Sequence, residues 1–116
     1  YFGNVSFFED TVLEALADHP KAKYFLVVGD GINQLDASGE EVIHHLVSRL
    51  KDAGVTLVFS GLKKQVLDVM RATGLFEAVT QNNIFATEDQ AIAAIYERLG
   101  DEAKDDLFCA VKPAMA

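Results

Sequence analysis

Two short, continuous apolar runs constrain the fold of this chain more than any other feature. They are Tyr24–Val28 and Val55–Phe59, and each is followed by turn residues and then by a segment with helical spacing of apolar residues. Strands that are apolar at every position are typical of parallel sheets covered by helices on both faces. The alternation of strands and helices therefore predicts an α/β fold. We expect a small, mostly parallel (mixed) β-sheet flanked by about four helices, with right-handed crossovers.

The helices are predicted from the spacing of their apolar residues and from the residues that begin and end them. We expect helices over residues 6–18, 38–53, 63–73 and 87–99. Thr87 with Gln90 three positions later is a capping-box pattern, and Gly54, Gly74 and Gly100 are natural helix ends.

The remaining segments give weaker signals. Tyr1–Phe2 is interpreted as the tail of a strand, and Val79 and Ile84–Phe85 as a last short strand or extended segment. Residues 101–116 are acidic and then small and apolar, so we expect a frayed helix or a disordered end there. The predicted organisation is a domain over residues 1–100 followed by an acidic C-terminal tail over 101–116.

Composition excludes several classes of function. The chain has 116 residues, half of them hydrophobic, which suits one globular domain with a core of its own. Its net charge of -8 argues against nucleic acid and against an anionic membrane surface, because both are bound through Lys and Arg. No apolar run approaches the about 20 residues of a spanning helix. The single cysteine, Cys109, favours a reducing compartment. The chain begins without Met, which we interpret as a domain excised from a longer protein.

The most specific local feature is the run Asp36–Gly39, between a predicted buried strand and the strongest predicted helix. We expect Ser38 to cap that helix, with Glu41 completing a capping box. The functional alternative is a phosphorylatable serine or an anion site, since a helix N-terminus offers N–H donors and the positive end of the helix dipole. Glu40 and Glu41 would oppose a phosphate there.

Other candidate sites are weaker. Gly29, Asp30 and Gly31 form a turn that lacks the third glycine of a dinucleotide fingerprint and the lysine of a P-loop, so it is only a weak nucleotide-loop candidate. The adjacent histidines 44 and 45 point in different directions on a helix and give no ligand spacing. No pattern places a nucleophile beside a base. We therefore expect no catalysis, no metal and no cofactor.

Several segments together resemble one known family. The run Asp36–Gly39 at a strand-to-helix junction is similar to the signature of STAS domains, which sulfate transporters and anti-sigma factor antagonists share. Further runs resemble other parts of the family pattern, in the family's order: Phe2–Asn4, Leu57–Leu62, Val66–Leu75 and Ile84–Ile92. The resemblance covers nearly residues 1 to 100.

The resemblance implies one of two functions. The opening segment and Gly61–Leu62 favour the sulfate permease (SulP) branch, in which the domain lies at the cytoplasmic face of the membrane and regulates the transmembrane domain of the same transporter. That branch implies an interaction surface at Asp36, Ser38, Gly39, Glu40 and Glu41, with soluble protein partners or a weakly bound nucleotide as further regulators. The alternative is a soluble anti-sigma factor antagonist that is switched by phosphorylation of Ser38.

Overall fold

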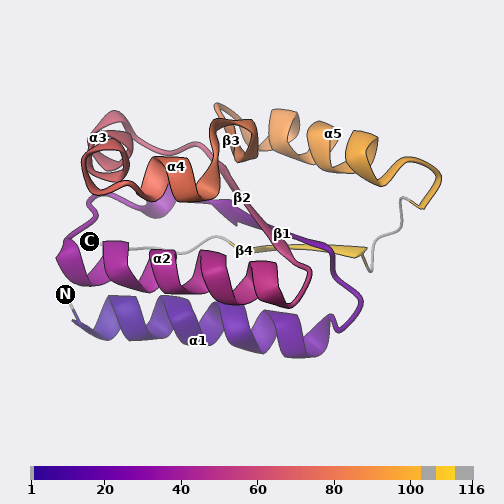
Figure 1. Ribbon diagram of the computed structural model, residues 1–116, viewed down its shortest axis with the longest axis horizontal. Coiled ribbons are helices and arrows are strands. Elements are labelled where there is room, and N and C mark those ends of the chain that lie inside the picture. The colour runs from indigo at the N-terminus through magenta and orange to yellow at the C-terminus, as the bar shows by residue number, and fades with distance from the viewer. Residues whose placement is uncertain (1, 103–106, 112–116) are drawn as a thin grey trace.

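A four-stranded parallel sheet forms the centre of the molecule (Figure 1). The computed structural model describes residues 2–102 and 107–111. Its strands lie in the order β3-β2-β1-β4, and every strand pair is parallel. The strands are β1 (Tyr24–Val28), β2 (Thr56–Ser60), β3 (Ile84–Phe85) and β4 (Phe108–Val111). The predicted α/β class is confirmed, and the pairing is parallel at each described strand.

The central strands β1 and β2 have the burial that their apolar sequences predict. In each of them the first residue is partly exposed and the next four are buried. Their register runs from Tyr24 opposite Thr56 to Val28 opposite Ser60. Continuous hydrophobicity is required here because helices cover both faces of the sheet.

Five α-helices surround the sheet in the described residues. They are α1 (Phe2–Asp18), α2 (Ala37–Asp52), α3 (Lys64–Thr73), α4 (Leu75–Val79) and α5 (Glu88–Leu99). Short 3-10 helices occur at Gly29–Gly31, Gln81–Asn83 and Gly100–Glu102. The predicted start of α5 is confirmed, since the Thr87 side chain accepts a hydrogen bond from the Gln90 backbone N–H at 3.2 Å.

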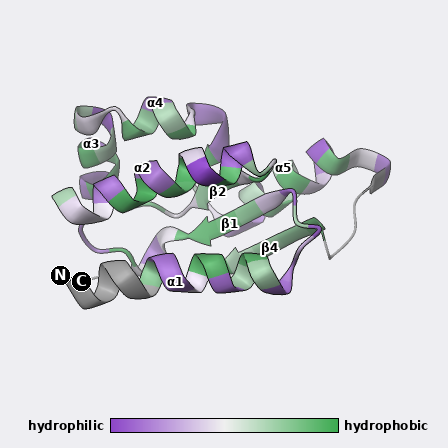
Figure 2. Ribbon diagram, turned by 60° about the horizontal axis from the view of Figure 1, so that its bottom comes forward, coloured by the Kyte–Doolittle hydropathy of each residue, from purple (hydrophilic) through white to green (hydrophobic). Residues whose placement is uncertain are grey.

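The two faces of the sheet have separate cores because successive strand residues point to opposite sides. Phe25, Val27, Leu57 and Phe59 face the cluster formed with α1, α2, α3 and α4. Leu26, Val28 and Val58 point to the opposite side and face the cluster formed with α5. In Figure 2, β1 and β4 are mostly hydrophobic and α1 runs beside them.

The N-terminal segment differs from the prediction. Phe2 is the first residue of α1, not part of a strand, and Tyr1 lies outside the described residues. Val5, Phe8 and Val12 continue one helical spacing, which explains why the helix begins before residue 6. Val79 is likewise the last residue of α4 rather than a strand residue, whereas the strand predicted at Ile84–Phe85 is confirmed.

The second unexpected element is β4. The sequence predicts a frayed helix or a disordered end for residues 108–111, but they pair with β1 from Tyr24 opposite Phe108 to Val27 opposite Val111. Cys109 faces the α1 side of the sheet and is only 6% exposed. The side chain of Phe108 packs edge-on against Tyr96 of α5. β4 therefore covers the edge of β1 that β2 leaves open.

Candidate functional site at the carboxyl end of the sheet

The loops that follow β1 and β2 pack directly against each other. A Cβ atom on Gly29 would lie 2.5 Å from the Leu62 side chain and 2.9 Å from the backbone oxygen of Ser60. Gly61 has a φ of +65°, and a Cβ atom there would overlap the Asp30 carboxylate. Both glycines are therefore explained by close approach of the two loops, and neither requires a bound ligand.

Asn33 connects the loop after β1 to the start of α3. The Lys63 ammonium donates to the side-chain oxygen of Asn33. The Gln65 side chain donates to the Asn33 backbone oxygen at 3.1 Å. These bonds join residues that are 30 and 32 positions apart in the chain. They fix the loop that leads into Asp36 and Ser38 against its neighbour.

Asp36, and not Ser38, caps α2. Asp36 has an extended conformation, and its Oδ1 accepts a hydrogen bond from the Gly39 backbone N–H at 2.8 Å. The predicted capping box of Ser38 and Glu41 is wrong because the helix begins at Ala37, so that Ser38 is already its second residue. Ser38 is half-buried, and within the described part of the chain its hydroxyl has no hydrogen-bond partner.

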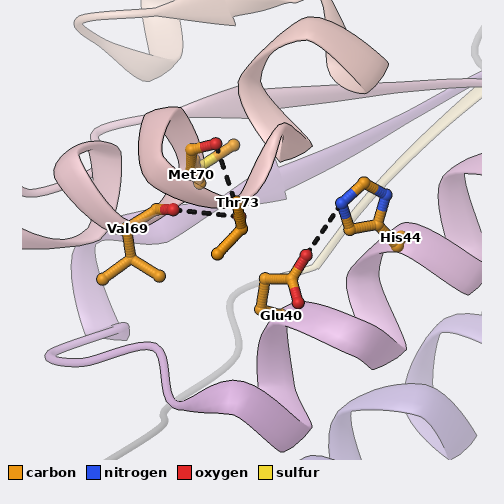
Figure 3. A network of polar contacts seen from close by, with 5 residues as sticks. All are labelled: Glu40, His44, Val69, Met70 and Thr73. Atoms are coloured by element: carbon orange, nitrogen blue, oxygen red, sulfur yellow. Dashed lines mark hydrogen bonds and ion pairs between the residues drawn. The ribbon is translucent and has the colours of Figure 1, made fainter.

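Glu40 is directed along α2 and not toward the helix start. Its carboxylate lies 2.7 Å from Nε2 of His44, one turn further on (Figure 3). The Glu40 side chain is 16% exposed and that of His44 is 36% exposed. Figure 3 also draws a separate bond on α3, in which the Thr73 hydroxyl donates to the backbone oxygen of Val69 at 2.9 Å. The half-buried carboxylate expected to oppose a phosphate near Ser38 thus has a partner of its own.

The hydrogen bond from Gly39 holds the pKa of Asp36 below its ordinary value of 3.8. A carboxylate with a lowered folded-state pKa stabilises the fold above its unfolded pKa, and this stabilisation is lost as the pH falls through the folded pKa. We expect Asp36→Asn, which keeps a capping oxygen but cannot titrate, to lose less free energy of unfolding than the wild type between about pH 6 and pH 3. Urea unfolding at several pH values measures this.

Asp36→Ala is the matched variant for this prediction. It removes the capping oxygen, so we expect it to be less stable than Asp36→Asn at every pH. Identical acid dependence of the wild type and Asp36→Asn would contradict the assignment of Asp36 as the charged cap.

The weak nucleotide-loop candidate at Gly29–Gly31 has a structural explanation. Gly29, Asp30 and Gly31 form one 3-10 turn, closed by a hydrogen bond from the Ile32 N–H to the Gly29 oxygen at 3.0 Å.

Across residues 2–102 and 107–111, no group of three or more His, Cys, Asp or Glu side chains is placed to hold a metal ion. None of the helices in these ranges combines the length and the hydrophobicity needed to cross a bilayer.

The sequence identifies the run Asp36–Gly39 as a candidate site, but it does not predict which side chains contact that run. Asp, like Ser, is a preferred N-cap residue, so Asp36 gives a signal equal to that of Ser38. The roles of Asn33, Lys63 and Gln65 have no local signal, because they depend on two loops that are far apart in the sequence.

The fold is shared with a solved α/β structure. It is similar to a structure described as "Crystal structure of sulfate transporter family protein from Wolinella succinogenes", with a TM-score of 0.72 and 24% sequence identity. The similarity covers 88% of this chain and 80% of that one. At this level of identity it establishes the fold.

Residues 1–91 match the family model described as "STAS domain". The chain belongs to the STAS domain family, which confirms the resemblance predicted from its motifs. It is 27% identical over 90 residues to a protein of Bacillus subtilis (strain 168) named "Putative sulfate transporter YvdB". This match covers 78% of the present chain and 17% of that relative.

Proposed function

We propose that this chain is the regulatory STAS domain of a SulP-type anion transporter, located at the cytoplasmic face of the membrane and in contact with the transmembrane part of the same protein. The observation that carries the proposal is the match to 17% of the length of a protein named as a sulfate transporter. A match to so small a part is what a domain appended to a transport unit would give. We expect the domain to regulate transport and to catalyse no reaction.

The surface proposed for this contact is the start of α2. Asp36 and Glu41 are exposed there, Ser38 and Glu40 are half-buried, and Gly39 is buried. The cap by Asp36 and the bonds from Lys63 and Gln65 to Asn33 hold the segment in one arrangement. An ordered helix start with an accessible hydroxyl is suited to contacts that depend on the charge state of one residue.

A negative charge on Ser38 would disturb this arrangement in a definable way. Free N–H groups and the helix dipole favour an anion in the first turn. The Gly39 N–H is already occupied by Asp36, however, so a phosphate on Ser38 would compete with that carboxylate and repel it. The cap and the loop behind it would then rearrange, which changes the surface offered to the transmembrane part.

We expect Ser38→Asp to change anion flux through the full-length transporter by about threefold or more, while Ser38→Ala leaves flux close to that of the wild type. Ser48→Asp, at an exposed position further along the same helix, is the matched control for added charge on α2. Transport assays in vesicles, normalised to the amount of protein in the membrane, measure this. If Ser38→Asp and Ser48→Asp both leave flux unchanged, regulation through the start of α2 is refuted.

The alternative function is a soluble anti-sigma factor antagonist switched by phosphorylation of Ser38. The partly accessible Ser38 hydroxyl, which does not serve as the cap, favours this candidate. Fractionation of the native full-length protein separates the two proposals, because a transporter stays in alkaline-washed membranes and an antagonist does not. Addition of one phosphate to Ser38 by a partner kinase and ATP, detected by intact mass, would support the antagonist.

A further inference from the structure

A small pocket lies at the opposite end of β2 from Ser38. It has a volume of about 140 Å³, is open to solvent on one side, and is lined by the end of α2, the beginning of β2, the end of α4 and the loop that follows α4. An apolar cavity of about 150 Å³ is large enough to hold benzene in another protein. The pocket therefore has room for the apolar part of a ligand about as large as one ring or a branched chain.

The inner wall of the pocket is apolar. Val55, Leu57 and Val79 line it and are 8%, 4% and 3% exposed, so they are core residues with one side turned to the pocket. Val47 of α2 lines it as well and is half-buried. Val55, Leu57 and Val79 are already almost fully buried, so half-buried Val47 and exposed Ala78 supply most of the apolar surface that a ligand could still cover, at about 25 cal/mol for each Å² removed from water.

The outer wall is a strained loop that is held in place by hydrogen bonds. Thr80 has a φ of +73°, which is unfavourable for a β-branched residue. The Asn83 side chain donates to the Val79 oxygen at 2.9 Å and to the Thr80 hydroxyl at 3.2 Å. Its own oxygen accepts from Arg98 of α5 at 2.7 Å. The wall is thus formed before any ligand arrives, and a preformed pocket binds with a smaller entropic cost.

Lys51 sets the charge of the pocket. It follows Val47 by one helical turn, and among the described residues that line the pocket it is the one that carries a charge. Its ammonium is exposed, so it can pair with an anion at the mouth while its aliphatic stem lies over the apolar wall. The chemistry is that of a cationic group at the rim of an apolar site.

We propose that this pocket binds a small organic carboxylate with a compact apolar body. The body lies against Val55, Leu57 and Val79, and the carboxylate pairs with the Lys51 ammonium. The site is separate from the start of α2 and does not depend on the function proposed above.

The test is a titration of the ¹⁵N-labelled full chain with benzoate, followed by amide chemical shifts. Acetate supplies the carboxylate without the apolar body, and benzyl alcohol supplies the body without the charge. We expect saturable shifts with benzoate at the amides of Val47, Lys51, Leu57 and Thr80. Acetate should not saturate over the same concentrations, and benzyl alcohol should bind about two- to fivefold more weakly, as expected for loss of an exposed ion pair.

Two variants complete the test. Lys51→Gln should weaken benzoate binding about two- to fivefold, while Lys21→Gln, at an exposed lysine outside the pocket, should leave it unchanged. Val47→Phe should fill the pocket and abolish the saturable shifts. Shifts that are scattered or linear, equal affinity for benzyl alcohol, or equal effects of the two lysine variants would each overturn the proposal.

Discussion

Replacement of Cys109 by aspartate should lower the free energy of unfolding by about 3 kcal/mol or more, because it places a carboxylate in the core without a partner. Cys109 lies opposite Phe25 in the sheet and belongs to the cluster that Phe8 and Val12 of α1 cover. Burial already raises the pKa of its thiol, which shows that the site disfavours charge. Urea unfolding followed by circular dichroism at neutral pH measures the change.

Ala110→Asp is the matched control. Ala110 is the next residue of the same strand, but it is exposed, so we expect the same new charge to change stability by no more than about 0.5 kcal/mol. Equal effects of the two substitutions would mean that β4 is not held against β1 in the register described.

β4 shows where the sequence signal is insufficient. The strand has four residues, and it follows an acidic stretch that is typical of a solvated end. Its partner β1 is apolar at every position, which indicates burial but does not say which segment supplies the neighbour on each edge. The pairing of residues 24–27 with 108–111 is a long-range contact, and local periodicity cannot reveal it.

The parts of the fold that the sequence predicts are those with strong local patterns. β1 and β2 are uniformly apolar, and α2, α3 and α5 have apolar residues on one face and are followed closely by glycines. The helix predicted at α1 is too short, because it is started at residue 6 and Phe2 is assigned to a strand. Phe2 is instead the first residue of α1, in which Val5, Phe8 and Val12 continue the helical spacing of apolar residues.

The sequence predicts where the candidate site lies along the chain, but not the hydrogen bonds that arrange it. Asp36 and Ser38 are both good N-cap residues two positions apart, and the choice between them depends on where the backbone leaves the extended conformation. The link from Asn33 to Lys63 depends on the close packing of two loops, which follows from the parallel order of β1 and β2. Such contacts become visible only when the strands are placed side by side.

Gly29→Ala should test that loop packing directly, with an expected loss of about 2–3 kcal/mol in the free energy of unfolding. The new methyl group would meet the Ser60 backbone oxygen and the Leu62 side chain, so the ends of β1 and β2 would have to separate. The same movement would loosen the hydrogen bonds that hold Asn33 to the start of α3. Chemical denaturation gives the stability, and amide shifts at Asn33, Asp36 and Ser38 report the displacement.

Gly54→Ala separates this effect from backbone strain. Gly54 has a φ of +81°, and no atom lies within 4 Å of the position that a methyl group would take there. Alanine at this position therefore costs only the about 1–2 kcal/mol of a left-handed conformation. Gly29 is the reverse case, in which the cost comes from contact. If Gly29→Ala is no more destabilising than Gly54→Ala and leaves the amide shifts of Asn33, Asp36 and Ser38 in place, the two loops are not closely packed. If it shifts them, the carboxyl ends of β1 and β2 are mechanically coupled to the start of α2, and a change at either loop can reach the surface around Ser38.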